Sequence, residues 1–567
     1  MEILQYFVGK QKDYKGMRKK YKKNEKLESI PKDSFPVKCL NGIFVGKEEE
    51  NIISYKGIPF AKPPIKNLRW KPPLDCDNSN DIYEAYYFQK SSIQTKDDSE
   101  LGSFYEIGED CLYLNIWKYN DNEKNKPVMV FIHGGSFGWG GTTDPLYDGH
   151  NYVKKHKDII LVTIAYRLSI LGFLDLTLIK GGENYKESSN LGLLDQIQSL
   201  KWVNKNIENF GGDKNNVTIF GESAGALSVT ILPLIKGSKG LFKKIISQSG
   251  TFAWTIKKED GKLLVDKLKS EIKKQRKEEV DMNYLLNLSE EEIINLNSRL
   301  NMFCLFPMRD GYIIPEDCYG EIEKGAYNGI DLIIGTTADE IRYWILECNY
   351  LYIYKIFLNL LLENVLLYRI KKNGYEIFDR YKSIVKDNPK EAFINDLFFR
   401  VPALKIAQLH SKNNGNVYLY YWLYPSSIPN FEACHAVELA YIFNNLHAQI
   451  YIGDKNINYK LAEISQDMWA NFAKNGNPST KDYKWEKFDD KNNYSMELGK
   501  EIVLKNNLFS KERNEIIFPL LELYISSFYA TLSFNIPFIR KVIYIFVAFL
   551  IIILSILINK YLINNQR

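Results

Sequence analysis

A serine between two glycines ends a short apolar run. Val217-Thr-Ile-Phe220 is followed by Gly221-Glu-Ser-Ala-Gly225, which places Ser223 in a Gly-x-Ser-x-Gly turn between a predicted strand and a predicted helix. The serine backbone is strained in such a sharp turn, and Gly221 and Gly225 lack the side chains that would collide there. The turn raises the hydroxyl above the sheet, where a base and a substrate carbonyl can reach it. Ser223 is therefore a candidate nucleophile.

A serine hydroxyl is a weak nucleophile near neutral pH, so it needs a histidine base that is oriented by a carboxylate. Of the six histidines, His435 lies late in the chain, in a predicted loop that enters a helix. One known order of such a triad is nucleophile, acid and then histidine, which a late histidine satisfies. Asp339 and Glu340 follow the apolar run Leu332-Ile-Ile-Gly335. Either carboxylate could be the acid, or both could only favour the start of a helix.

Backbone N–H groups that could bind an anionic oxygen follow another predicted strand. Pro127-Val-Met-Val-Phe-Ile132 is a continuous apolar run, and His133-Gly-Gly-Ser136 comes directly after it. The amides of this turn, together with the amide of Ala224 after the nucleophile, can donate to the oxygen of a tetrahedral intermediate. These groups together predict acyl transfer.

Strands and helices alternate around these motifs. Residues 158–165 form another apolar run, residues 191–203 have apolar positions at helical spacing, and residues 243–248 and 332–335 fit further strands. Such an order implies right-handed crossovers between parallel strands. We therefore expect one α/β domain over residues 39–525, with a large, mostly parallel central sheet flanked by helices. The apolar residues 351–368 are typical of a buried helix pair, or of a gate or membrane-dipping surface.

The two ends of the chain have different compositions. Residues 1–38 are rich in lysine and lack the apolar core of a secretory signal, so we expect a solvated tail or a basic segment that touches an anionic membrane. Residues 542–558 carry no charge and lie between Arg540-Lys541 and Lys560, which predicts a transmembrane helix. The expected protein is therefore tail-anchored in the endoplasmic reticulum or another endomembrane, with its catalytic domain in the cytosol.

The composition of the chain excludes some classes of partner and favours one cellular environment. The net charge of +5 is small against 74 basic and 69 acidic residues, so no nucleic-acid partner is expected. The seven cysteines are scattered, without CxxC pairs or the density of a disulfide scaffold, which favours a reducing compartment. Serine-based acyl transfer requires no metal and no organic cofactor. The sequence does not indicate an oligomeric state.

Longer motifs resemble the type-B carboxylesterase/cholinesterase family. They include Asn209-Phe-Gly-Gly-Asp213 before the serine turn, Glu109-Asp-Cys-Leu-Tyr-Leu-Asn115 and Asn190-Leu-Gly-Leu-Leu-Asp-Gln196. The similarity runs from about Asn41 to about Gly476 and implies an α/β-hydrolase fold.

The resemblance also assigns roles to single residues. It implies that Glu340 is the acid and His435 the base, and that Ser136 replaces a glycine often found in the oxyanion hole. The implied oxyanion donors are the amides of Gly135, Ser136 and Ala224; Glu222 and Ser249 match positions that support the site; and the implied structural ion pairs are Arg69 with Glu109 and Arg167 with Asp195.

The sequence departs from the family pattern in one region. The family's first disulfide would join Cys111 to a cysteine about twenty residues upstream, where residues 88–94 contain serines instead. Cys76, farther upstream, is the alternative partner. The same loop has no tryptophan for binding a quaternary ammonium group, so choline esters are not expected as preferred substrates.

The sequence therefore predicts a serine carboxylic-ester hydrolase that acts through an acyl-enzyme. Aromatic residues near Phe137, Trp139, Trp254 and Phe303, together with the expected anchor, favour lipophilic esters. The alternatives are a catalytically inactive adhesion or scaffold protein and a lipid or sterol ester hydrolase.

Overall fold

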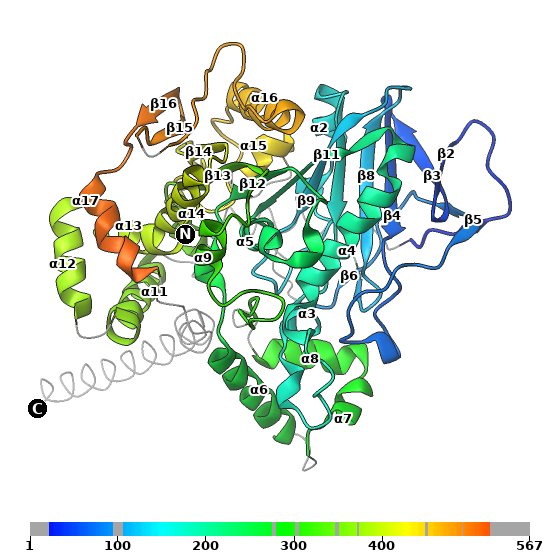
Figure 1. Ribbon diagram of the computed structural model, residues 1–567, viewed down its shortest axis with the longest axis horizontal. Helices are drawn as coiled ribbons and strands as arrows, with labels where there is room; N and C mark the ends of the chain where they lie inside the picture. Colours follow the sequence, from blue (N-terminus) through cyan, green and yellow to red (C-terminus); the bar gives the residue numbers. More distant parts are fainter. Residues whose placement is uncertain are drawn as a thin grey trace, which may run out of the picture.

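A sheet of fourteen strands forms the centre of the molecule (Figure 1). The computed structural model describes residues 22–94, 106–274, 279–300, 305–345, 351–370, 373–447, 452–489 and 491–521. The strands follow the order β1-β5-β3-β4-β8-β10-β9-β11-β12-β13-β14-β15-β16, and β2 pairs with β3 outside this path. Neighbouring strands from β10 to β15 in this order are parallel, and the outer pairs β4–β8, β8–β10 and β15–β16 are antiparallel. The expected α/β architecture with a mostly parallel central sheet is confirmed.

The strands of this sheet and of a small second sheet have the following bounds: β1 (Lys26–Leu27), β2 (Phe35–Cys39), β3 (Asn41–Glu49), β4 (Ile52–Pro59), β5 (Ser79–Glu84), β6 (Ser91–Ser92), β7 (Ile107–Gly108), β8 (Tyr113–Tyr119), β9 (Lys126–Ile132), β10 (Ile160–Ile164), β11 (Gly212–Glu222), β12 (Lys244–Gln248), β13 (Asp331–Thr337), β14 (Val417–Trp422), β15 (Tyr494–Leu498) and β16 (Ile502–Asn506). The second sheet contains β6 and β7.

The α-helices lie on both faces of the sheet and at one end of it (Figure 1). Their bounds are α2 (His150–Lys155), α3 (Ser169–Phe173), α4 (Leu191–Asn206), α5 (Ala224–Ile231), α6 (Lys258–Lys273), α7 (Met282–Leu286), α8 (Glu290–Leu300), α9 (Cys318–Glu323), α11 (Leu351–Asn364), α12 (Gly374–Ile384), α13 (Pro389–Asn395), α14 (Val401–Lys412), α15 (Leu439–Phe443), α16 (Tyr459–Asn475) and α17 (Lys511–Ile517). Helices α6, α7 and α8 gather below the sheet in Figure 1, and α11, α12 and α17 gather beside it.

The two faces of β9 show why the central strands are apolar throughout. Val128 and Val130 belong to one hydrophobic cluster, whereas Met129 and Phe131 belong to a second cluster. Successive side chains of a strand point to opposite faces, so a strand covered by helices on both sides buries every residue. This explains the uninterrupted apolar runs before the glycine-rich turns.

The first strands lie within the segment that the sequence placed in a lysine-rich tail. β1 pairs with β5, and β2 pairs with β3 across the expected boundary at residue 38. Phe35 and Val37 pack against the core from β2. Ordered structure therefore begins well before residue 39, because these backbone groups are satisfied by partners elsewhere in the chain.

Residues 351–368 form α11 and the start of a π-helical segment, Val365–Ile370, in place of the expected helix pair. Tyr354, Leu358 and Leu362 from α11 are buried in the second cluster. The helix thus packs one face against the core.

The predicted membrane anchor, residues 542–558, lies outside the described residues. Among the helices that the structure describes, none combines the length and the apolar character that a membrane crossing needs.

Candidate active site

The turn at Ser223 has the strained geometry that its sequence predicts. Ser223 has φ 56° and ψ −118° and stands directly before α5. A Cβ on Gly225 would lie 1.9 Å from the carbonyl oxygen of Ile132, and one on Gly221 would lie 2.6 Å from the carbonyl carbon of Gly225. Both glycines are therefore required where β11 and α5 pass β9. The Ser223 N–H donates to the carbonyl of Gln248 at 2.9 Å, which fixes the turn to β12.

Glu340 and His435 are in direct contact although 95 residues separate them. Glu340 follows β13, and its Oε2 lies 2.5 Å from His435 Nδ1. The other oxygen of Glu340 accepts the Thr337 N–H at 2.8 Å, so the carboxylate is held in one orientation. Both side chains are buried. This arrangement can fix the tautomer of the imidazole and leave Nε2 available for proton transfer.

Asp339, the other acid that the residues alone left open, faces away from His435. Its Oδ2 accepts the N–H of Ala433 at 3.2 Å, and its Oδ1 lies 3.9 Å from Arg342 Nε. Burial raises the pKa of Asp339 to about 6 despite the nearby guanidinium. Glu340 is thus the carboxylate that orients His435.

Glu222 lies on the opposite side of the His435 ring from Glu340. His435 Nε2 is 3.0 Å from Glu222 Oε1, and the described residues show no hydrogen bond between Nε2 and the Ser223 hydroxyl. Burial disfavours the imidazolium, but the carboxylates of Glu222 and Glu340 outweigh it and raise the pKa of His435 to about 9. Burial in turn raises the pKa of Glu222. The His435 ring therefore lies between two carboxyl groups, one of them on the residue before the candidate nucleophile; although Glu222 Oε1 is close to Nε2, it makes no hydrogen bond.

A third buried carboxyl group, Glu438, lies three residues after His435. Its Oε1 accepts from Gln248 Nε2 at 3.4 Å and from the Tyr420 hydroxyl at 3.3 Å. Burial and the charge of Glu340 raise the pKa of Glu438. The sequence analysis did not single out this residue, although a glutamate between Val437 and Leu439 is a usable signal because carboxylates are rare in apolar surroundings.

The loop after β9 lies against the serine turn. A Cβ on Gly134 would lie 3.2 Å from the Ser223 Cβ, so the backbone of this loop can approach the nucleophile only because glycine is there. Gly135 has φ 99° and Ser136 has φ 51°. Within the described part of the chain, the N–H groups of both residues lack a hydrogen-bond acceptor, and both residues are partly exposed. With the amide of Ala224 at the start of α5, they form a set of donors beside Ser223.

His133 anchors this loop instead of serving as a base. Its Nδ1 lies 2.8 Å from the Gly134 carbonyl oxygen, and its ring stacks on Tyr166 at 4.5 Å between centroids. Burial lowers the pKa of His133 to about 4, so the ring is neutral at physiological pH.

Aromatic side chains connect the His435 region to the glycine-rich loop. The ring of Phe399 lies 5.3 Å from that of His435 and 5.6 Å from that of Trp254. Phe306 continues the series, at 5.9 Å from Trp254 and 6.2 Å from Phe137. Phe303, which the sequence grouped with these residues, lies outside the described residues. The wall beside the candidate triad is therefore apolar.

The two expected ion pairs are confirmed. Arg69 Nε and Nη2 donate to Glu109 at 2.6 Å and 2.5 Å, and Arg167 Nε and Nη2 donate to Asp195 at 2.8 Å and 2.7 Å. All four residues are buried. Bidentate pairs of this kind hold neighbouring segments in a single geometry.

Ser249 follows β12 and has φ 59°. Its N–H donates to the Gly335 carbonyl at 2.9 Å, and its buried hydroxyl has no hydrogen-bond partner.

Cys76 and Cys111 are both free thiols, so the substitute disulfide considered from the sequence does not form. Among the described residues, no group of three or more potential ligands could hold a metal ion.

Comparison with known proteins agrees with this geometry. The model of the carboxylesterase family matches residues 35–516. The para-nitrobenzyl esterase of Bacillus subtilis is 34% identical over 489 residues, which cover 83% of this chain and 96% of that protein. Liver carboxylesterase 1F of Rattus norvegicus is 30% identical to this chain. The alignment covers 79% of this chain and 86% of that protein.

A solved structure of a thermophilic PNB esterase superimposes with a TM-score of 0.75 at 31% identity, covering 85% of this chain and 99% of the other. The residues that the family model matches include the serine turn and the segments that carry Glu340 and His435. The chain belongs to the carboxylesterase family, the type-B carboxylesterase/cholinesterase family of α/β-hydrolases, and it is a carboxylic ester hydrolase.

Proposed function

We propose that the protein cleaves carboxylic esters through an acyl-enzyme formed on Ser223. The contact between Glu340 and His435, beside a strained serine and a loop with unpaired N–H groups, is the observation that supports this mechanism. His435 Nε2 must turn from Glu222 to the serine hydroxyl, which stands on the residue next to Glu222. Relatives are named para-nitrobenzyl esterase and liver carboxylesterase, and these names do not state a mechanism.

In the first half-reaction, Ser223 Oγ attacks the ester carbonyl carbon and gives its proton to His435 Nε2. The carbonyl oxygen becomes an anion that accepts hydrogen bonds from the amides of Gly135, Ser136 and Ala224. The bond to the alcohol oxygen then breaks, and His435 returns the proton to that oxygen. In the second half-reaction, water attacks the acyl carbonyl carbon and gives a proton to His435. The bond from this carbon to Ser223 Oγ then breaks, His435 returns the proton to Oγ, and the carboxylic acid leaves.

The test uses a fluorophosphonate probe, which labels an activated serine covalently. The full-length protein is expected to be labelled and to hydrolyse para-nitrophenyl acetate, whereas Ser223→Ala is expected to do neither. A folded wild-type protein that is not labelled would favour the alternative of an inactive adhesion or scaffold protein. Equal labelling of Ser223→Ala would assign the nucleophile to another residue.

We propose lipophilic esters as the preferred substrates. The support is the aromatic series from His435 to Phe137, which can cover an apolar acyl or alcohol group. A panel of para-nitrophenyl esters from acetate to decanoate, with a cholesteryl ester added, measures this preference. Because Trp254 is the centre of the series, Trp254→Ala should lower kcat/KM for decanoate more than for acetate. An equal effect on both esters would contradict the proposal.

We also propose that residues 542–558 anchor the protein to an endomembrane with the catalytic domain in the cytosol. The support is the uncharged segment between basic flanks in the sequence. Extraction of cell membranes at alkaline pH should leave the full chain in the pellet and release a form that ends at residue 541. Protection of the catalytic domain from added protease would reverse the proposed orientation.

A further inference from the structure

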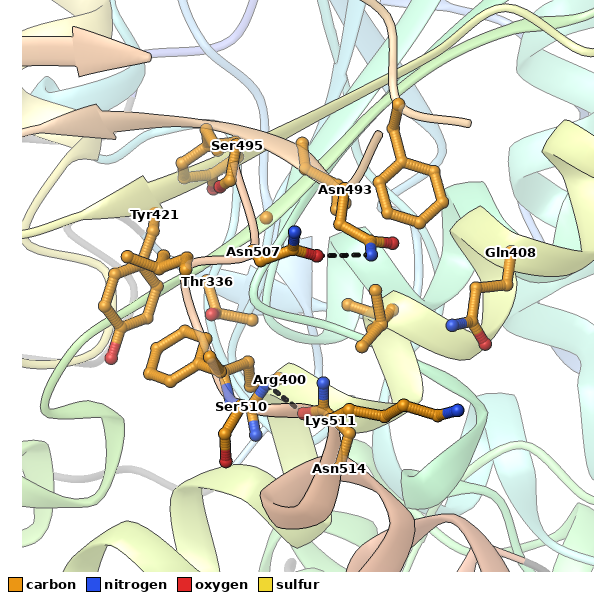
Figure 2. Close-up of a pocket in the computed structure, with 18 of the residues that line it drawn as sticks. Thr336, Arg400, Gln408, Tyr421, Asn493, Ser495, Asn507, Ser510, Lys511 and Asn514 are labelled. Carbon is orange, nitrogen blue, oxygen red and sulfur yellow. Dashed lines mark hydrogen bonds between the residues drawn. The ribbon is translucent and has the colours of Figure 1, made fainter. Parts of the chain in front are cut away.

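A second cavity lies apart from the candidate triad. It has a volume of about 660 Å³, and none of Ser223, Glu340 and His435 lines it. Its wall is formed by β13 and β14, by Arg400 and α14, by residues 507–518, and by Phe488, Asn493 and Ser495. Sites for small organic ligands commonly have volumes of about 300–1,000 Å³. Figure 2 shows Asn493 and Asn507, hydrogen bonded to each other, on one side of this cavity, and Arg400, Ser510 and Asn514 on the other.

Arg400 is a charged residue in this wall, and one of its hydrogen-bond donors has no acceptor. The side chain is only 8% exposed. Its Nε donates to Asp396 at 2.6 Å and its Nη1 donates to Asn514 at 2.7 Å, whereas Nη2 is buried and has no hydrogen-bond partner. A guanidinium group presents its donors in a fork that fits a carboxylate, and a buried donor without an acceptor is destabilising. Solvent does not reach Nη2 in this conformation, so an oxygen of a bound anion would satisfy it once the guanidinium turns toward the cavity.

Arg400 shares its carboxylate partner with a second guanidinium group. Arg513 also binds Asp396, through Nε at 2.7 Å and Nη2 at 3.0 Å. The exposed pair of Lys511 and Glu515, at 3.6 Å, is neutral as a whole. Asp396 alone therefore cannot neutralise both guanidinium groups, which favours an anionic ligand at Arg400.

Part of the remaining wall is apolar. The Arg400 guanidinium stacks on the ring of Phe509 at 4.0 Å, and Phe488, Phe518 and Leu404 line the same space. We propose that this cavity binds an apolar carboxylic acid as its anion, with the carboxylate on Arg400 and the hydrocarbon part along Phe488, Leu404 and Phe518. The site takes up ligand without turnover, so it does not depend on the proposed ester hydrolysis.

Calorimetry with the full-length protein tests the ligand class with three probes: decanoate, decanol and acetate. Decanoate should bind at least ~10-fold more tightly than decanol, since a charge-assisted hydrogen bond contributes more than a neutral one. Acetate should bind more weakly than decanoate because it lacks the hydrocarbon part. Arg400→Gln should reduce decanoate binding to the level of decanol. Equal affinities of the wild-type protein for decanoate and decanol would overturn the proposal.

Because Arg400 belongs to an ion-pair network, a second variant leaves the network intact. Leu404→Trp fills the cavity and should abolish decanoate binding, whereas Lys405→Trp, at the neighbouring position that does not line the cavity, should not. Crystals soaked in 10-bromodecanoate then locate the ligand by the anomalous signal of bromine. Bromine in this cavity supports the proposal. Bromine only beside Ser223, or decanoate binding that Leu404→Trp does not change, overturns it.

Discussion

The exchange of Glu222 for Gln is expected to shift the pH at which the enzyme loses activity. His435 acts as a base only when it is neutral, and its pKa is raised from 6.5 to about 9, so activity should fall as the pH drops below about 9. Glu222 Oε1, at 3.0 Å from Nε2, is the carboxylate whose charge raises this pKa most. An opposite charge at such a distance typically changes a pKa by about 1–3. Glu222→Gln should therefore lower the midpoint of the acid limb by about 1–3 pH units.

The assay is the pH dependence of kcat/KM for para-nitrophenyl acetate, because this ratio reports the ionisation of the free enzyme. The pH dependence of the rate of inactivation by a fluorophosphonate should give the same midpoint, because this reaction does not include deacylation. The matched control is Glu432→Gln, which removes an exposed carboxylate from the loop that carries His435. This control should leave the midpoint unchanged. Glu222→Gln is also expected to lower the maximal rate, but the midpoint does not depend on the amplitude.

Two results would refute the reasoning. A wild-type midpoint near the ordinary value of histidine would show that the charges of Glu222 and Glu340 do not outweigh burial in solution. A high midpoint that survives Glu222→Gln would assign the effect to Glu340 or Glu438 instead.

Three further predictions concern stability and are measured by thermal unfolding of the full-length chain. Gly225→Ala places a methyl group against the backbone of β9 and should destabilise the protein by about 1–3 kcal/mol or prevent folding, whereas Gly237→Ala, whose Cβ would meet one atom at 3.8 Å, should be tolerated. Burial raises the pKa of Glu438, so the folded protein keeps a proton that the unfolded chain releases, and stability is lost as the pH rises from the ordinary pKa of glutamate to the folded pKa. Glu438→Gln should remove this loss and gain ~1–3 kcal/mol at neutral pH; a wild-type melting temperature that rises over this range would contradict it. Arg167→Met leaves Asp195 buried without its partner and should cost about 3–5 kcal/mol; a variant as stable as the wild type would show that the pair is dispensable.

The central part of the fold could be predicted from the sequence because its strands are buried on both faces. The apolar runs that precede the two glycine-rich turns became β9 and β11, and residues 191–203 became part of α4. The edges of the sheet could not be predicted in this way. β1 lies in a lysine-rich stretch, and its pairing with Ile82 and Tyr83 of β5 is a contact between segments far apart in the sequence. Local periodicity carries no information on such a pairing.

The same difference between local structure and long-range contacts applies to the candidate site. The turn around Ser223 is a local structure, and the collisions that a Cβ would cause at Gly221 and Gly225 are the reason that the local pattern identifies it. The choice between Asp339 and Glu340 depends on how the chain leaves β13, and adjacent residues of the same chemistry cannot be distinguished by position alone. The family resemblance implied Glu340, and in the structure Glu340 is the residue that contacts His435.

The protonation of the site depends on carboxyl groups that the fold brings together. No local sequence pattern shows that these groups are close to one another. Glu222, Glu340 and Glu438 come from three segments, and all three are buried around one imidazole. Three carboxylates and one imidazolium would leave two negative charges in excess in an apolar environment, so at least one carboxyl group holds a proton at neutral pH. In the proposed mechanism, the proton that His435 takes from Ser223 would enter a network that already stores one. The charge on Glu222 would favour the imidazolium that forms in the transition state, but the same charge would make His435 a base only at higher pH. We therefore expect the same contact to set the maximal rate and the pH range of the enzyme.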